Sequence, residues 1–436
     1  MEEINLTLIF LLVLFLLLGT GVWVGLALFG VAYIGLELFT SRPAGDAMLT
    51  TIWSASSSWT LTALPLFIWM GEILYRTRLS EDMFRGLSPW MRGLPGGLIH
   101  TNIVGCTVFA AVSGSSAATL TTVGKMAIPE LRARKYPEYM IIGTLTGAAT
   151  LGLMIPPSLT LIVYGVTINE SITKLFIAGI LPGLTLAAMF MAYVALWSAV
   201  RPGEVPDISA RLPLREKMRE SRFLIPVLLL IAVIIGSLYL GFATATEAAS
   251  FGVIGSLLMA ASQGSLTWRT FIESLLGATR TSAMIALILA GAAALSLAMG
   301  FTGLPKALAG WIDAWDLSRF QLLIALMIFY IILGCFLDGI SSVVLTMAIV
   351  EPMIRAEGID IIWFGIFIVI VVEMAQITPP IGFNLFVMQG LTGHDMGYIA
   401  KTALPMFAIM VLMVFVLIFF PELATYLPEN MRPGPA

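Results

Sequence analysis

The sequence has few charged residues and very few residues that carry redox or metal chemistry. Charged residues make up 11% of the 436 positions, whereas 59% are hydrophobic. An ordinary water-soluble domain is about one quarter charged, so this composition excludes that class. The chain has two cysteines, Cys106 and Cys335, far apart and in apolar surroundings. We interpret them as buried small hydrophobic residues, not as a disulfide or a metal pair.

Patterns of enzymatic chemistry are also missing. His100 and His394 lie in different halves of the chain beside loop-like sequence, which argues against a metal site or a catalytic dyad. Residues 123–126 read VGKM, but Thr119 stands where a phosphate-binding loop needs glycine, and Met126 where it needs serine or threonine. We therefore expect no enzyme, no ATP hydrolysis by this chain, no cofactor and no nucleic-acid partner.

Long apolar runs recur along the whole chain instead. They occupy residues 6–39, 175–200, 223–242, 281–302 and 401–421. Several are close to the roughly 20 residues that a helix needs to cross the hydrocarbon core of a bilayer. The first run lacks the small-residue cleavage site of a signal peptide, so we expect it to stay in the mature chain. The sequence predicts an all-α polytopic membrane protein embedded in a lipid bilayer.

Charge in the loops predicts the orientation. Lysine and arginine are concentrated at residues 76–92, 125–135 and 201–222, which we expect on the cytoplasmic side. In the loops at 306–319 and 351–360, taken together, acids outnumber bases. Tracing from these loops predicts about ten full crossings, with both termini outside.

Two segments are too short for this count. Residues 97–124 lie between two basic loops, yet 28 residues cannot cross twice, and residues 320–350 pose the same problem on the opposite face with 31. We predict that both are re-entrant helical hairpins, at about 94–131 and 320–354. Their tips read AVSGSSAAT and LDGISSVV. Non-helical backbone at membrane depth is tolerated only where protein or a water-filled cavity satisfies its polar groups.

A Pro-Pro pair interrupts the apolar run after each hairpin. Pro156 and Pro157 follow the first hairpin, and Pro379 and Pro380 follow the second. Proline removes an amide donor and clashes with the preceding turn, so a helix must break there and leave carbonyl groups free. We predict discontinuous helices at about 138–168 and 361–391.

These features are repeated along the chain. Gly114 and Gly339 are 225 residues apart, while Pro156 and Pro379 are 223 apart. Because the loop charges place equivalent elements on opposite faces, we predict two inverted repeats, residues 1–200 and 223–421, a cytoplasmic linker at 201–222 and a C-terminal tail at 422–436. Interrupted segments at matching positions of two repeats indicate a transporter binding site at the membrane midplane.

The motifs SGSSAAT, GLMIPPS, LFIAGILPG, TATEAA and ITPPIGFNLFV resemble the large membrane subunit of the tripartite ATP-independent periplasmic (TRAP) transporters, and the likeness covers essentially the whole chain. The resemblance implies an elevator-type secondary transporter in the bacterial inner membrane and sodium-coupled uptake of a small organic acid or related solute. It also implies a small membrane subunit and a periplasmic solute-binding protein as partners.

The hairpin tips and helix breaks supply candidate ligands for the sodium ion that the resemblance implies, because a hard cation prefers oxygen ligands. The candidates are Ser113, Gly114, Ser115, Ser116, Pro156, Pro157 and Ser158 in the first half, and Asp338, Gly339, Ser341, Ser342, Thr378, Pro379 and Pro380 in the second. Ser116, Ser158 and Asn384 are also candidates for binding the substrate. The alternative is that the serines only cap short helices, the prolines only kink them, and Asp338 is an N-cap with no ion in contact.

Three further points stay open at this stage. Glu72, Glu247 and Glu373 lie in or beside apolar runs, where a carboxylate can serve function, pair helices or face a partner subunit. Residues 50–59 and 266–280 combine tryptophan, serine and charge before a span, and we interpret them as helices in the membrane interface. A channel whose hairpin tips form a selectivity filter is the alternative function, distinguished by channel-like flux in place of saturable, sodium-dependent uptake.

Overall fold

The computed structural model describes residues 2–40, 44–206, 213–303, 310 and 317–432, and every regular element in these ranges is a helix. Six of the described helices are long and apolar enough to cross a membrane, or seven if the pair α12 (Leu214–Ser221) and α13 (Ile225–Tyr239), bent by 60°, forms one span. The predicted class of all-helical protein with several candidate spans is therefore confirmed. Ten full-length spans are not found among these residues, because five further apolar helices have only 10–17 residues.

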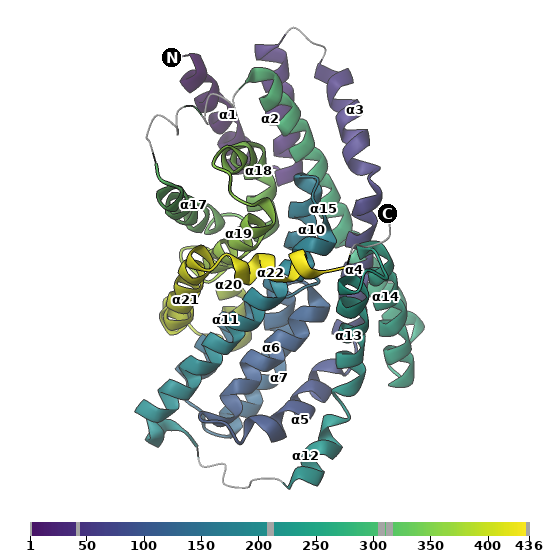
Figure 1. Ribbon diagram of the computed structural model, residues 1–436, viewed down its shortest axis with the longest axis vertical. Coiled ribbons are helices and arrows are strands. Elements are labelled where there is room, and N and C mark those ends of the chain that lie inside the picture. The colour runs from purple at the N-terminus through teal and green to yellow at the C-terminus, as the bar shows by residue number, and fades with distance from the viewer. Residues whose placement is uncertain (1, 41–43, 207–212, 304–309, 311–316, 433–436) are drawn as a thin grey trace.

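The first helices of each half of the chain pack together in one part of the molecule. They are α1 (Glu2–Gly19), α2 (Val24–Phe39), α3 (Ala44–Ser56), α4 (Ala63–Tyr75) after the 3-10 helix η1 (Trp59–Thr62), α13, α14 (Ala245–Ser262) and α15 (Trp268–Thr302). Helix α15 packs against α2, α3 and α4, and α14 packs against α4 (Figure 1). A Cβ atom at Gly291 of α15 would lie 2.5 Å from the Gly25 carbonyl oxygen of α2. Glycine thus permits the close approach that holds helices together in a membrane.

Helix α15 is continuous over 35 residues. The sequence predicts an interfacial helix at 266–280 that ends before a span, and this boundary is absent. The Thr267 hydroxyl caps the start of α15 by accepting from Thr270 N at 3.1 Å, and neither glycine nor proline follows Arg280 to interrupt the helix before Gly291. Trp53 and Trp268 are 75% and 78% exposed, as interfacial tryptophans are.

The same order of elements occurs twice in the remainder of the chain. A helical hairpin is followed by an interrupted helix and then by a long helix that contains a proline. The first set comprises α6 (His100–Ser113), α7 (Ser116–Ala133), α8 (Glu138–Ala149), α9 (Leu151–Met154), α10 (Leu159–Thr167) and α11 (Ile172–Val200). The second comprises α17 (Arg319–Gly334), α18 (Gly339–Ala356), α19 (Ile361–Gln376), α20 (Phe383–Thr392) and α21 (Met396–Phe419).

Helical structure stops on both sides of each Pro-Pro pair. The first interrupted helix ends at Met154 and resumes at Leu159, and the second ends at Gln376 and resumes at Phe383. Both follow from the missing amide donor and the ring of proline. The remaining elements are α5 (Leu79–Met91), the 3-10 helices η2 (Gly97–Ile99) and η3 (Pro202–Glu204), and α22 (Glu422–Asn430).

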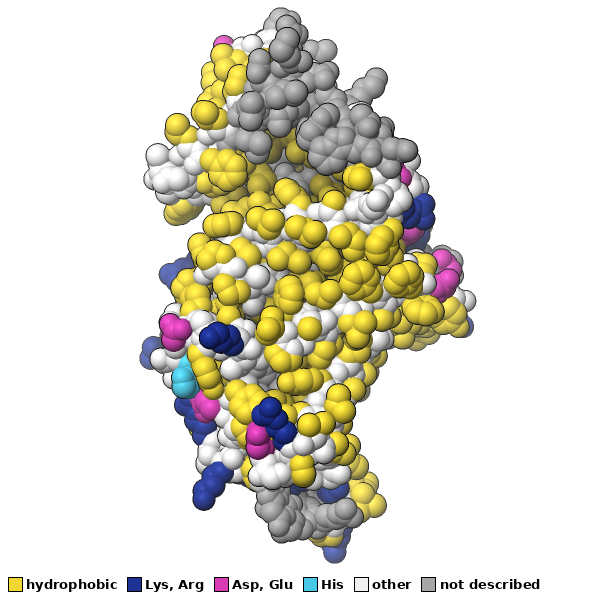
Figure 2. All heavy atoms as spheres, turned by 90° about the vertical axis from the view of Figure 1, so that its left-hand side faces the viewer, with side chains coloured by type: hydrophobic (Ala, Val, Ile, Leu, Met, Phe, Trp, Pro, Cys, Tyr) yellow, Lys and Arg dark blue, Asp and Glu magenta, His cyan; other side chains and the backbone are white. Residues whose placement is uncertain are grey.

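The interrupted helices lie in the centre of the molecule. In the most hydrophobic 18-residue stretch of residues 138–167, 94% of the residues are buried. In α19, fifteen of the sixteen residues are buried. By contrast, α21 lies on the outside and exposes Leu404, Leu412 and Phe419. Figure 2 shows that hydrophobic side chains cover much of this side of the molecule, with charged side chains gathered toward its lower part. Such a surface is suited to lipid.

Candidate functional site

The tip of the first hairpin lies on the first helix break. Gly114, between α6 and α7, has a φ of +60°, and its carbonyl oxygen accepts a hydrogen bond from Leu159 N at 3.4 Å. A Cβ atom at Gly114 would lie 2.9 Å from the Pro157 carbonyl oxygen. On the other side, a Cβ atom at Gly152 would lie 2.7 Å from both Ser115 O and Ser116 Cα. The backbones of tip and break are therefore in direct contact, which only glycine allows.

The tip of the second hairpin lies on the second break in a similar way. The Cys335 thiol contacts the carbonyl oxygens of Thr378 at 3.7 Å and Pro379 at 3.3 Å. A Cβ atom at Gly334 would lie 2.5 Å from Ala375 Cβ. Both cysteines are buried and unpaired, which confirms their interpretation from sequence.

The two halves meet at these tips. A Cβ atom at Gly339, in the second tip, would lie 2.8 Å from Val372 Cγ1 of α19 and 3.6 Å from Leu153 Cδ1 of α9. The carboxyl group of Glu373, also on α19, faces the Ser116 hydroxyl in the first tip. These contacts bring both hairpin tips and both helix breaks together in one place.

Three of the candidate ligands cap the helices that start here. Ser115 Oγ accepts from Ala118 N at 3.4 Å, and Ser158 Oγ accepts from Leu161 N at 3.3 Å and donates to the Leu153 carbonyl. Asp338 Oδ2 accepts from Ile340 N at 3.1 Å and from Ser341 N at 3.2 Å. The capping alternative is thus realised at these positions. A cap uses part of the acceptor capacity of the side chain, so ion binding by the same groups stays a prediction.

The other candidates differ in their partners. Ser113 Oγ lies 2.8 Å from Thr119 Oγ1, and Thr378 Oγ1 donates to Met374 O at 2.7 Å. Ser116 is 5% exposed. Pro156, Pro157, Pro379 and Pro380 lie within the breaks, and both Pro-Pro peptide bonds are cis.

Buried polar atoms without hydrogen-bond partners collect around the tips. Among the described residues, such atoms also occur at Ser88, Arg92, His100, Asn102, Thr122, Thr160, Gln263 and Ser282, while those near the tips and breaks of the second half belong to Ser341, Ser342, Glu373, Gln376 and Asn384. Each such group costs about 1–3 kcal/mol when buried alone, and a native structure tolerates few of them. Their concentration where four broken elements meet indicates a binding site for a polar or charged ligand.

Sequence reasoning missed Gln376 and left the role of Glu373 open. Both lie on α19 three residues apart, and so on one face of the helix. The sequence signal that could have identified them is the presence of two polar side chains within an otherwise apolar run. The sequence did not show that this face turns toward Ser116.

The other two carboxylates have structural roles away from the tips. Glu247 is exposed and forms a capping box with Thr244, whose backbone N donates to Glu247 Oε2 at 2.8 Å. Glu72 of α4 pairs with Arg76, the residue that follows this helix, and a Cβ atom at Gly277 of α15 would lie 2.5 Å from Glu72 Oε2. Of the three, only Glu373 lies at the candidate site.

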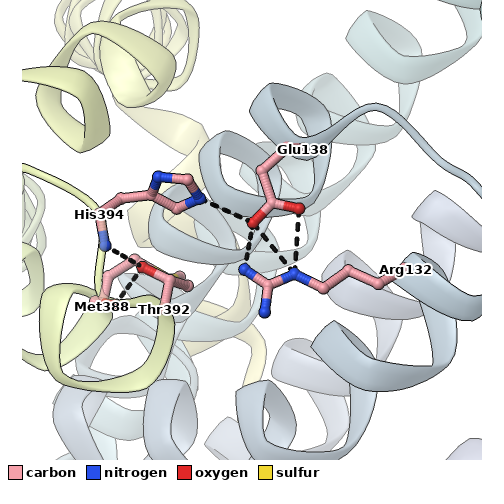
Figure 3. Close-up of polar contacts among 5 residues, drawn as sticks. All are labelled: Arg132, Glu138, Met388, Thr392 and His394. Carbon is pink, nitrogen blue, oxygen red and sulfur yellow. Dashed lines mark hydrogen bonds and ion pairs between the residues drawn. The ribbon is translucent and has the colours of Figure 1, made fainter.

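An ion-pair cluster links the two halves at the far end of the first hairpin (Figure 3). Arg132, near the end of α7, donates from Nε to both carboxylate oxygens of Glu138 at 3.0 and 3.1 Å. His394, between α20 and α21, places Nε2 at 3.0 Å from Glu138 Oε1. Its backbone N donates to Thr392 Oγ1 at 3.4 Å. Within the described part of the chain, no three His, Cys, Asp or Glu side chains are grouped to hold a metal ion.

Comparisons with known proteins identify a family and relatives that match most of this chain. Residues 11–423 match the family model for the tripartite ATP-independent periplasmic transporter, DctM component. The chain is 31% identical to the C4-dicarboxylate TRAP transporter large permease protein DctM of Pseudomonas aeruginosa, over 90% of this chain and 91% of that protein. It is 29% identical to the isethionate TRAP transporter permease protein DctMQ of Oleidesulfovibrio alaskensis, over 95% of this chain and 64% of that longer protein.

A solved structure is similar in fold. The YdaH transporter of Alcanivorax borkumensis superposes with a TM-score of 0.67 at 14% sequence identity, over 94% of this chain and 98% of that chain. At this identity the likeness concerns the fold alone.

Proposed function

The chain belongs to the DctM family of tripartite ATP-independent periplasmic (TRAP) transporters, and we propose that it forms the path by which a small organic acid or related solute enters the cell with sodium across the bacterial inner membrane. The family consists of transporter components and not of enzymes. The observation that carries the proposal is the convergence of two hairpin tips and two helix breaks around buried, unpartnered polar groups.

The chemistry of the site favours an anionic solute. Helices α7, α10 and α18 all begin at the tips or breaks. A helix N-terminus carries partial positive charge and free amide donors, which suit a carboxylate or sulfonate. Ser116, Ser158 and Asn384 add side-chain polar groups. The names of two relatives specify C4-dicarboxylate and isethionate, both small organic anions.

We propose an elevator motion in which both hairpins and both interrupted helices move as one unit. Helices α1, α2 and α15 would stay in place with the small subunit. An apolar cavity of about 690 Å³ lies between these helices and the second hairpin, lined by Phe10, Val31, Leu295, Phe329 and Leu345 among others. A hydrophobic boundary with little polar bonding supports sliding of one unit past the other.

Two partners follow from the tripartite family. The relative named DctMQ joins a second component in one protein, and this chain covers 64% of it. We propose a separate DctQ-type small membrane subunit and a periplasmic solute-binding protein. The binding protein would capture dilute solute and release it at the tips.

Reconstitution tests the proposed function. Proteoliposomes should contain this chain, its co-encoded small subunit and its solute-binding protein, with radiolabelled succinate or isethionate outside. We expect saturable uptake that needs all three components and an inward sodium gradient. Robust uptake by this chain alone would refute the tripartite arrangement. Non-saturating flux indifferent to sodium would favour the channel alternative.

The sodium dependence of Asp338→Asn tests the second tip. Asparagine also caps helices well, so the variant should fold while losing the negative charge. We expect the sodium concentration for half-maximal uptake to rise about tenfold, equivalent to roughly 1.4 kcal/mol. Asp360→Asn is the matched control, because Asp360 caps α19 by accepting from Trp363 N at 2.7 Å and lies at the opposite end of that helix from the tips. Equal sodium responses in both variants would remove Asp338 from the coupling site.

A further inference from the structure

A small cavity lies where α8, α11 and α21 meet, at the opposite end of α8 from the first helix break. Its volume is about 270 Å³, and its lining includes Tyr139 of α8, Tyr193 of α11, and Tyr398 and Lys401 of α21. Tyr398 and Lys401 are exposed. At this end α11 leads into residues 201–222, the predicted cytoplasmic linker. The cavity therefore combines a cation with tyrosine hydroxyls at the cytoplasmic end of the outer helices.

Lys401 brings an uncompensated positive charge to this cavity. Within the described ranges, its ammonium group forms neither an ion pair nor a hydrogen bond. The carboxylates on or next to this end of the three helices all have other partners. They are Glu138, which pairs with Arg132, Glu204, which pairs with Arg201, and Asp395, which caps α21 through Gly397 N. An anionic ligand would supply the counter-charge that the described residues do not.

An apolar stripe on the outer face of α21 begins at Lys401. Leu404, Ala408 and Leu412 follow at intervals of three or four residues and are also exposed, so all four side chains lie on one face of the helix. Leu412 is 11 residues after Lys401, a rise of about 17 Å along a helix. This length matches one leaflet, which is half of the roughly 30 Å hydrocarbon core. A soluble anion would not use such a stripe, whereas the acyl chains of a phospholipid would cover it.

We propose that the cavity and the stripe together bind one anionic phospholipid of the cytoplasmic leaflet. Lys401 pairs with the lipid phosphate, Tyr193 and Tyr398 donate hydrogen bonds to headgroup oxygens, and the acyl chains lie along Leu404 and Leu412. Basic pockets between membrane helices on the cytoplasmic side bind anionic headgroups in this way. Because α8 and α11 belong to the first half of the chain and α21 to the second, the bound lipid stabilises the contact between the halves.

Lipid-dependent thermal stability tests this proposal. The chain, purified with its small subunit and freed of lipid, is titrated with detergent-solubilised dioleoylphosphatidylglycerol, and parallel titrations use dioleoylphosphatidylcholine and inorganic phosphate. We expect a saturable rise in the unfolding midpoint with phosphatidylglycerol only, since a ligand that binds the folded state stabilises it. No rise, or an equal rise with phosphatidylcholine, would overturn the proposal. An equal rise with inorganic phosphate would overturn it in favour of a soluble anion.

Substitution of Lys401 tests the position of the site. In Lys401→Gln we expect the half-saturating concentration of phosphatidylglycerol to rise about fivefold, the effect of one basic residue near an anionic lipid surface, and in Lys401→Arg to keep the wild-type value. Lys174→Gln is the matched control, because Lys174 is an exposed lysine in the first turn of α11, at the opposite end from Tyr193. Equal responses in Lys401→Gln and Lys174→Gln would overturn the assignment. The assay needs neither solute nor sodium, so its outcome is independent of the proposed uptake.

Discussion

Replacing Gly152 with alanine should strongly reduce uptake although it adds a single methyl group. The new Cβ atom would lie 2.7 Å from Ser115 O and Ser116 Cα and 2.8 Å from Ser115 C. These are backbone atoms of the first tip, which cannot turn aside as a side chain can. Either the hairpin moves away from α9 or the helix shifts toward the core. We expect destabilisation of about 1–3 kcal/mol, the usual cost of overpacking. Uptake should fall on the order of 100-fold, as when a positioned group moves by about 1 Å.

Gly390→Ala is the matched control for this prediction. Gly390 also lies within a helix, α20, and a Cβ atom there would meet nothing within 4 Å. Alanine at an unobstructed helical position stabilises by about 0.5–1 kcal/mol relative to glycine. Thermal unfolding midpoints and initial uptake rates should be measured for both variants in the same membranes. If Gly152→Ala behaves like Gly390→Ala, contact between the first tip and the first interrupted helix is not required for transport.

Replacing Asn384 with leucine should change stability and uptake in opposite directions. Asn384 is fully buried, and within the described residues neither its amide nitrogen nor its oxygen has a partner. An apolar side chain of similar size removes that desolvation cost, so we expect stability to stay equal or to rise by about 1–3 kcal/mol. We expect uptake to fall on the order of 100-fold, because a site that binds a polar ligand depends on its few polar groups.

Asn102→Leu provides the contrast. Asn102 is also fully buried, but its amide nitrogen donates to Ile141 O at 3.3 Å and to Thr144 Oγ1 at 3.0 Å, joining α6 to α8. This variant should lower the unfolding midpoint, because it removes the two hydrogen bonds that the Asn102 amide donates from α6 to α8. A loss of stability in Asn384→Leu as large as that in Asn102→Leu would show that Asn384 is a structural residue.

The sequence alone was sufficient to predict those features whose physical cause acts over a few neighbouring residues. Apolar runs predict membrane helices, and the described chain is all-helical with several candidate spans. The Pro-Pro pairs predict helix breaks, and the helices stop at Met154 and at Gln376. The family motifs predict membership of the TRAP transporters, and the family model matches residues 11–423. Each of these signals is contained in one short segment.

Tertiary structure decided the roles of individual polar residues. Three glutamates near apolar runs look alike in the sequence, yet Glu247 caps α14, Glu72 lies against α15, and Glu373 is buried at the hairpin tips. The continuity of α15 across residue 280 likewise became clear only in the folded chain. A missing amide at proline breaks a helix wherever that helix lies. The partner of a side chain, by contrast, depends on packing between segments that are far apart in the sequence. Ser116 and Glu373 are 257 residues apart, and no local sequence pattern shows that they come into contact.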